Sequence, residues 1–171
     1  MALLEILHYP DERLAQKCAA VTEITPELLK LADDMVETMY DAPGVGLAAP
    51  QVGVLQRLVV IDCTPSGEQV DLITAFNPEI VERDGECFEE EGCLSVPGYA
   101  AKVHRAAQVT VRYQDRSGAT VEREVDGLLA IAFQHELDHL DGILYVDRLS
   151  SLKRSMFRKK YQKMLAQSEL S

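Results

Sequence analysis

The sequence of 171 residues has no tryptophan, only four cysteines and no long apolar run. Its longest stretch without a charged residue is the 15-residue segment 42–56, which contains three glycines and two prolines and is too short and too broken to span a bilayer. The first residues lack the basic and apolar regions of a secretory signal, and they are too acidic for a transit peptide. We therefore expect a cytoplasmic protein with reduced thiols and no membrane segment.

Basic residues are also scarce, with 17 Lys and Arg against 28 Asp and Glu and a formal net charge of −11. This balance argues against general or sequence-specific binding of nucleic acid. The charge is uneven, because residues 148–171 hold seven bases and one acid and carry +6, whereas residues 1–147 carry −17. Since the length suits one domain, we expect a single domain over 1–171, with an acidic body (1–147) and a basic C-terminal helix or tail (148–171).

Three segments have the apolar spacing of helices. Thr25-Pro26-Glu27 combines an N-cap, a proline at the first helical position and an acid in the first turn, and it predicts a helix over 25–41. Residues 127–140 are nearly apolar in their first half, which predicts a helix buried inside the domain. Ser150 is expected to cap a last helix over about 151–167, whose apolar residues roughly share one side: Leu149, Leu152, Met156, Phe157, Met164 and Leu165.

Short β-branched or alternating segments predict strands between these helices. We expect strands at 57–62 and around 72–82, the second interrupted at Asn77-Pro78, and a hairpin joining 108–113 to 120–125. No βαβ rhythm is visible. The order predicts an α+β fold, with mainly antiparallel strands packed around a buried central helix, a helix in the N-terminal region and an amphipathic C-terminal helix.

The most informative segment is His135-Glu136-Leu137-Asp138-His139, an HExxH pattern on the predicted buried helix. Residues four apart lie on one face of a helix, so both imidazoles can reach one divalent metal. Glu136 is placed to address a water on that metal without binding it. A structural histidine pair on a solvated face is the alternative, but two histidines and an acid in a buried helix are costly unless something binds them.

A third ligand is needed, and the two common peptidase arrangements do not supply it. The extended histidine pattern would place its third histidine at Tyr145, and the zone that would supply a downstream glutamate, residues 159–164, contains none. The third ligand must therefore come from upstream. Cys93, which we expect in irregular backbone among Gly, Ser and Pro, is the best available candidate, whereas Cys18, Cys63 and Cys87 are expected to be core or surface thiols.

Three segments together resemble the motifs of the peptide deformylases. Residues 44–51 (GVGLAAPQ) are similar to that family's glycine–alanine motif, residues 91–95 (EGCLS) to its cysteine motif, and residues 134–139 (QHELDH) to its histidine motif. Their order and spacing agree with the family, and the overall similarity extends over effectively the whole chain. The resemblance implies a catalytic domain that removes the formyl group from the N-terminal formyl-methionine of new proteins and releases formate.

The resemblance also implies roles for individual residues. Cys93, His135 and His139 would hold one divalent metal, typically Fe²⁺, with Zn²⁺, Ni²⁺ or Co²⁺ as substitutes. Metal-bound hydroxide would attack the formyl carbon, with Glu136 as general base and then acid. The metal, the Gln51 side-chain amide and the Leu94 backbone N–H would stabilise the oxyanion.

Substrate-binding residues follow from the same resemblance and from the need for an apolar methionine pocket. Gly46 would make a backbone contact to the peptide. Val45, Leu128, Ile131 and Ala132 are the pocket candidates, since the last three lie within about two helical turns before His135. Each of these four pocket candidates is alternatively an ordinary residue of the hydrophobic core.

The roles of some residues, and the function itself, have alternatives. Asp138 either orients a ligand histidine or lies on a solvated face, and His8 and His104 are expected to be structural or exposed. An HExxH endopeptidase is the alternative enzyme, and a metal-stabilised or ribosome-binding module without catalysis is the alternative from another class.

The basic tail is a candidate contact to the ribosome surface near the tunnel exit, since the family acts on nascent chains. Lys153–Lys163 is the segment that would make this contact.

Overall fold

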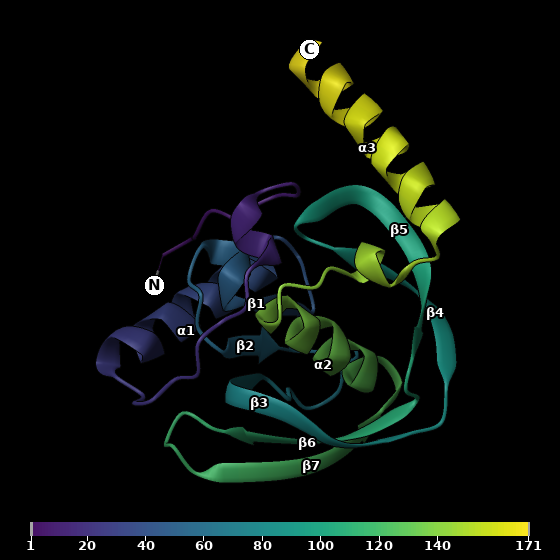
Figure 1. The fold of residues 1–171 in the computed structure, drawn as a ribbon. Coiled ribbons are helices and arrows are strands. Elements are labelled where there is room, and N and C mark those ends of the chain that lie inside the picture. Colours follow the sequence, from purple (N-terminus) through teal and green to yellow (C-terminus); the bar gives the residue numbers. More distant parts are fainter. Residues whose placement is uncertain (1, 171) are drawn as a thin grey trace.

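The computed structural model describes residues 2–170, and Figure 1 shows its arrangement. The three α-helices are α1 (Pro26–Asp41), α2 (Gly127–Leu140) and α3 (Ser151–Leu170), and short 3-10 helices occur at η1 (Glu12–Ala15), η2 (Ala49–Val52) and η3 (Tyr145–Arg148). The strands are β1 (Gly46–Ala48), β2 (Leu58–Ile61), β3 (Ile73–Asp84), β4 (Cys87–Cys93), β5 (Val96–Arg105), β6 (Gln108–Gln114) and β7 (Thr120–Asp126). None of the helices in this part of the chain is long and apolar enough to cross a membrane.

The strands form two separate antiparallel sheets. The larger has the order β1-β2-β3-β6-β7, and within residues 2–170 the strands β4 and β5 pair only with each other. Helix α2 lies against the larger sheet and is enclosed between it and the β4–β5 sheet (Figure 1). The predicted α+β fold, with antiparallel strands around a buried central helix, is confirmed.

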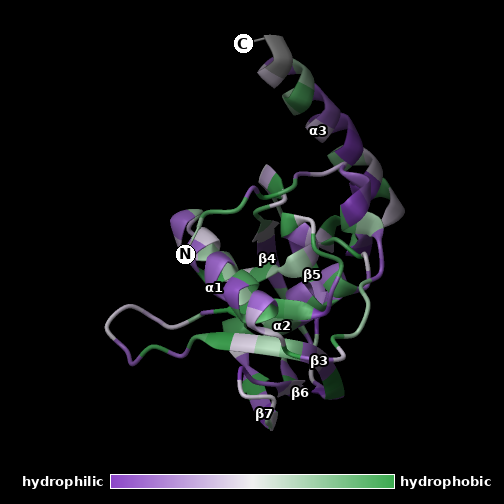
Figure 2. Ribbon diagram, turned by 90° about the vertical axis from the view of Figure 1, so that its left-hand side faces the viewer, coloured by the Kyte–Doolittle hydropathy of each residue, from purple (hydrophilic) through white to green (hydrophobic). Residues whose placement is uncertain are grey.

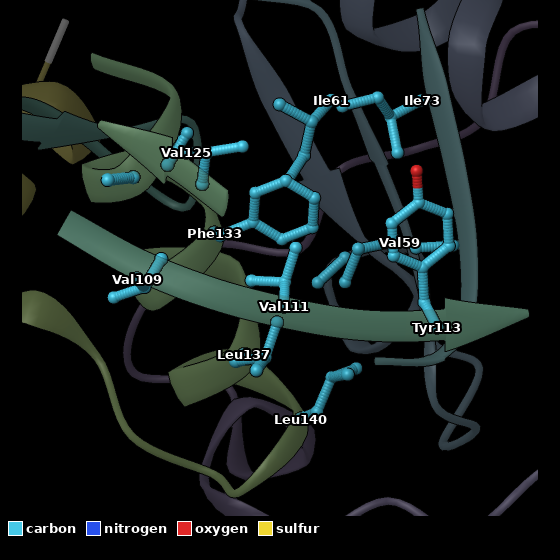
Figure 3. Close-up of a cluster of buried hydrophobic side chains, with 14 of the residues drawn as sticks. Val59, Ile61, Ile73, Val109, Val111, Tyr113, Val125, Phe133, Leu137 and Leu140 are labelled. Carbon is cyan, nitrogen blue, oxygen red and sulfur yellow. The ribbon is translucent and has the colours of Figure 1, made fainter. Parts of the chain in front are cut away.

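Helices α1 and α2 cover opposite faces of strand β2. Leu58 and Val60 pack with Met35 and Met39 of α1, whereas Val59 and Ile61 face α2. Figure 3 shows the α2 side, where Phe133, Leu137 and Leu140 meet the sheet residues. Burial on both faces explains why β2 is a continuous apolar run rather than an alternating one.

The start of α1 follows the expected local chemistry, since the Leu28 N–H donates to the Thr25 hydroxyl over 3.2 Å. The predicted interruption at Asn77-Pro78 is a bulge instead of a break. Strand β3 continues to Asp84, and its register with β6 shifts between Phe76 and Glu79. Asn77 adopts φ +51° there, and its side-chain amide bonds to both backbone groups of Val21.

The β4–β5 sheet is absent from the sequence-based prediction, and the expectation of irregular backbone at Cys93 is wrong. Cys93 ends strand β4 and pairs with Val96 across a tight turn, with a register shift just before it. The polar run Phe88–Gly92 has few of the apolar and β-branched residues that signal a strand. Pairing with β5 therefore decides its conformation.

Helix α3 projects from the body in both ribbon views (Figures 1 and 2). It is attached through Phe157 and Tyr161, which are buried against the rings of Tyr9 and Tyr99, with centroids 4.7 to 5.5 Å apart. The predicted common apolar side is wrong for three of its members, since Leu152, Met156 and Leu165 are 71%, 59% and 38% exposed. The reason is periodicity, because positions 157, 161 and 164 form the inward stripe. Ser171, the end of the predicted tail, lies outside the described residues.

Candidate metal centre and cleft

Cys93, His135 and His139 come together at the end of β4 and on α2. One potential ligand atom from each lies within 4.8 Å of the other two, and Cys93 Sγ is 3.4 Å from His139 Nε2. The helix supplies both imidazoles from one face because they are four residues apart. The tight turn after β4 carries the thiol to them.

Packing of α2 determines which way the histidines point. Phe133, Leu137 and Leu140 recur at helical spacing and fill the core against the sheet. His135 and His139 occupy a different side of the helix, where both are buried. The apolar stripe therefore fixes the rotation of the helix, and this rotation presents the imidazoles to Cys93.

The donor set suits a divalent transition metal. A thiolate with two imidazoles matches the borderline-soft ions. His135 Nδ1 lies 2.9 Å from Glu91 Oε1, which holds the ring and leaves Nε2 as its free nitrogen. Among the described residues, Glu136 Oε1 is buried without a hydrogen-bond partner. An orphaned carboxylate oxygen beside three convergent ligands fits a site built for a metal and its associated water.

The two imidazoles differ in their preference for a proton. Burial opposes protonation of His135, but Glu136, Cys93 and Glu91 outweigh it and raise the pKa of His135 well above its usual value. Burial, reinforced by the neighbouring His135, keeps the pKa of His139 well below its usual value. Of the two rings, His135 therefore binds a proton more readily than His139.

Glu136 is only 5% exposed and lies against strand β1. Burial raises the pKa of its carboxyl to about 7, opposed in part by His135. A methyl group added at Gly46 would lie 2.5 Å from Glu136 Oε2 and 3.1 Å from its Cγ. Only glycine at position 46 leaves the room that this carboxylate occupies, and a carboxyl with a pKa near neutrality can both accept and donate a proton.

A chain of ion pairs, buried at Glu91 and Arg105 and exposed at Arg148, adjoins His135 on the side of its Nδ1 atom. Arg105 donates from Nε and Nη2 to Glu91 over 2.8 and 2.9 Å, and from Nη1 to Asp138 over 2.6 Å. Arg148 donates to both oxygens of Asp138 over 2.9 and 2.7 Å. These contacts link β4, β5, α2 and η3.

Of the two alternatives for Asp138, the solvated face is wrong, because Asp138 is only 8% exposed. Its hydrogen bonds run to Arg105 and Arg148, and Glu91 is the residue that contacts His135. Sequence reasoning missed Glu91 and Arg105. The available signal was the alternation of a strand, which places Glu91 on the same face as Cys93.

A cleft of about 1140 Å³ opens beside the three convergent ligands. Every residue predicted to stabilise the oxyanion or bind substrate lines it: Val45, Gly46, Gln51, Leu94, Leu128, Ile131 and Ala132. Val45 and Leu128 are 44% and 55% exposed, and Ala132 is buried. The predicted exposure of His8 and His104 is confirmed, with His8 on the cleft wall and His104 stacked on Phe88 at 4.2 Å.

Gln51 is 1% exposed and held from both ends of its amide. Its Oε1 accepts from the Ala48 N–H over 2.9 Å, and its Nε2 donates to Ser95 Oγ over 3.1 Å. The same Nε2 lies 3.7 Å from Cys93 Sγ. This arrangement orients an amide donor beside the thiol before any ligand arrives.

Comparison with known proteins gives a consistent result. The family model described as polypeptide deformylase matches residues 3–155. The chain is 54% identical over 162 residues to the peptide deformylase of Thermodesulfovibrio yellowstonii, covering 95% of this chain and 98% of that protein. It is also 49% identical over 171 residues to the peptide deformylase of Alkalilimnicola ehrlichii, covering 100% of this chain and 96% of that protein.

Solved structures agree with these relatives. The crystal structure of a peptide deformylase from Legionella pneumophila superposes with a TM-score of 0.91 at 48% identity and covers 99% of both chains. That of the Ehrlichia chaffeensis enzyme in complex with actinonin superposes with a TM-score of 0.89 at 37% identity, covering 96% of this chain and 98% of that one.

Proposed function

The chain belongs to the polypeptide deformylase family, metal-dependent amide hydrolases that remove the N-formyl group from nascent peptides, and from this premise we propose how its own residues carry out the reaction. The convergence of Cys93, His135 and His139 beside an orphaned, buried Glu136 is the observation that carries the proposal. The substrate is the formyl-methionine terminus of a new chain, and the products are formate and a free amine.

Cys93, His135 and His139 would hold one divalent ion, which we propose is Fe²⁺ in the native enzyme, with Zn²⁺, Ni²⁺ and Co²⁺ as substitutes. The thiolate and two neutral imidazoles leave one net positive charge, and they suit all four of these ions. Such an ion, when bound, supplies Lewis acidity that makes water nucleophilic at neutral pH. Glu91 would hold the His135 ring in its ligating orientation through the 2.9 Å contact at Nδ1.

Glu136 would take the proton released as water attacks the formyl carbon. It would then deliver that proton to the nitrogen of the departing methionine, so that one carboxyl serves as base and then as acid. Its pKa of about 7 suits both steps, because neither protonation state is strongly disfavoured near neutral pH. The contact with Gly46 fixes where the carboxylate stands.

Gln51 and Leu94 would stabilise the negative charge that develops on the formyl oxygen. The Gln51 amide is already oriented by Ala48 and Ser95, so it loses little freedom when the reaction occurs. The Leu94 backbone N–H follows Cys93 in the tight turn and offers a second donor.

The methionine side chain would enter the apolar part of the cleft. Val45, Leu128, Ile131 and Ala132 supply the pocket, and Gly46 in the edge strand β1 offers backbone groups to the peptide. The exposed Val45 and Leu128 leave the mouth open to a long chain.

We place this reaction in the cytoplasm, with residues 1–147 as the catalytic body and residues 148–171 as a basic contact to the ribosome surface near the tunnel exit. Lys159 and Lys163 of α3 are exposed and support such a contact, because they lie on the side away from Phe157 and Tyr161.

The Glu136→Gln variant tests this function. Formate release from a formyl-Met peptide should fall by about 10²- to 10⁴-fold while the metal stays bound, since the variant removes the proton carrier and none of the three ligands. Glu82→Gln, which changes an exposed acid on β3, should remain active. Wild-type cleavage of an internal peptide bond without formate would contradict deformylation, and full activity in Glu136→Gln would contradict the role of Glu136.

A further inference from the structure

One wall of the cleft carries two carboxylates that the proposed reaction does not use, Glu89 and Glu90. Strand β4 alternates, so that Glu89 shares one face with Cys87, Glu91 and Cys93, and all four line the cleft. Glu90 reaches the cleft rim from the other face, where it lies opposite the basic Lys102. Glu91 and Cys93 serve the metal centre. Glu89 lies on the same wall two residues further from it.

The charge of Glu89 is uncompensated. Glu91 is neutralised by Arg105, whereas Glu89 is exposed, has no ion pair or hydrogen bond among the described residues and lies opposite Val103. The neighbouring Lys102 and His104 belong to the other face of the hairpin, where both lie against the ring of Phe88. Among the cleft-lining residues that the structure describes, none is a lysine or an arginine.

The position of Glu89 along β4 matches the part of the substrate peptide that follows the formyl-methionine. A strand rises about 3.3 Å per residue, so Glu89 lies about 13 Å along β4 from Cys93. An extended peptide advances by a similar rise per residue, so this span corresponds to the first few residues after the formyl group. A long basic side chain there would bring its charge to Glu89.

We propose that Glu89 makes this enzyme favour formylated chains that carry a lysine or arginine among their second to fourth residues. The inference rests on the proposed deformylase function and adds a substrate preference to it. The attraction is that of a partly solvated ion pair, which corresponds to about a 2- to 5-fold effect on kcat/KM and weakens as salt screens the charges. An acidic residue in the same positions would be disfavoured to a similar degree.

The test uses three series of formyl-Met tetrapeptides in which the second, third or fourth residue is Lys, Gln or Glu. Formate release gives kcat/KM for each peptide with the metal-loaded wild type, Glu89→Gln and Glu82→Gln. The two variants change net charge equally, but Glu82 is an exposed residue of β3 outside the cleft lining. Glu82→Gln therefore controls for the general attraction between basic peptides and an acidic protein.

We expect the Lys-to-Glu ratio of kcat/KM to exceed one in wild type and Glu82→Gln in at least one series. This ratio should approach one in Glu89→Gln. In wild type it should shrink at about 0.5 M salt, because the distance over which charges act is then reduced to roughly the length of one contact. The inference is overturned if wild type has no preference in any series, if Glu89→Gln keeps the full ratio, or if Glu82→Gln loses it equally. Formate release from none of the peptides would instead overturn the proposed function.

Discussion

A single methyl group at Gly46 should disable the enzyme by displacing Glu136. The new Cβ would lie 2.5 Å from Glu136 Oε2, 3.0 Å from Cδ and 3.1 Å from Cγ. Ordinary contact begins near 3.4 Å, so the carboxylate oxygen must move by about 0.9 Å. Because Glu136 is buried, neighbouring side chains limit its retreat. A displacement of about 1 Å at a reacting group costs on the order of 10²-fold in rate, which is the loss of kcat that we expect for Gly46→Ala.

Formate release from a saturating formyl-Met peptide measures this effect, with metal content and melting temperature recorded for each variant. Gly44→Ala is the matched control, because its Cβ would meet Leu94 Cδ1 at 2.8 Å, and that atom is the end of a flexible side chain. Gly44→Ala should therefore lose much less than Gly46→Ala. Both variants should bind metal, since the side chains nearest to the new Cβ atoms are those of Leu94 and Glu136, and neither of these is a proposed metal ligand.

A double substitution separates displacement of Glu136 from obstruction of the peptide. If the methyl group acts through Glu136, adding Gly46→Ala to Glu136→Gln should cost little further activity, because the two changes disable the same step. A blocked peptide would instead raise KM and multiply the loss in the double variant. Unchanged kcat in Gly46→Ala would refute the reasoning that this contact positions the carboxylate.

Three further predictions concern Glu91 beside the candidate metal centre, the buried thiol of Cys63 and the basic residues of α3. Glu91→Gln should weaken metal binding by about 10- to 100-fold in a chelator competition, whereas Glu79→Gln, which breaks a surface ion pair with an arginine, should not. Burial raises the pKa of Cys63 from 9.0 to about 11, so its stabilising effect is complete below pH 9 and is lost as the pH rises through 11. Cys63→Ala should therefore flatten the fall of melting temperature over this range, and an unchanged slope would contradict it. Lys159→Glu combined with Lys163→Glu should reduce co-sedimentation with ribosomes without lowering activity on short peptides, and equal co-sedimentation would exclude this contact.

Local patterns predicted the parts of the fold and site that depend on local physics. Helix α1 begins at Pro26 because its cap and first turn are encoded within three residues. The pair His135 and His139 follows from helical geometry alone, and its burial follows from the apolar residues around it. Cys93 required a different argument, namely that the downstream sequence has no third ligand to offer.

What the sequence did not reveal depends on contacts between distant segments. Glu91 and Arg105 are 14 residues apart, and they meet only because β4 pairs with β5 in a register that no local pattern specifies. The orientation of α3 was misjudged for a related reason. Leu152 and Met156 are apolar like the inward Phe157, but the aromatic rings of Tyr9 and Tyr99 select the face that carries Phe157.

The candidate metal centre lies where the two sheets of the molecule are joined. The β4–β5 sheet has no strand pairing with the larger sheet among the described residues, and a two-stranded sheet alone is only marginally stable. Its polar links to α2 are the contacts of Cys93, Glu91 and Arg105 with His139, His135 and Asp138. Burying these charges is costly unless each is paired, so the network is a weak source of net stability. The physical role of the network is geometric. It holds the thiol on one sheet at a fixed place relative to the histidines of a helix that packs on the other sheet, and the proposed metal would complete the same connection.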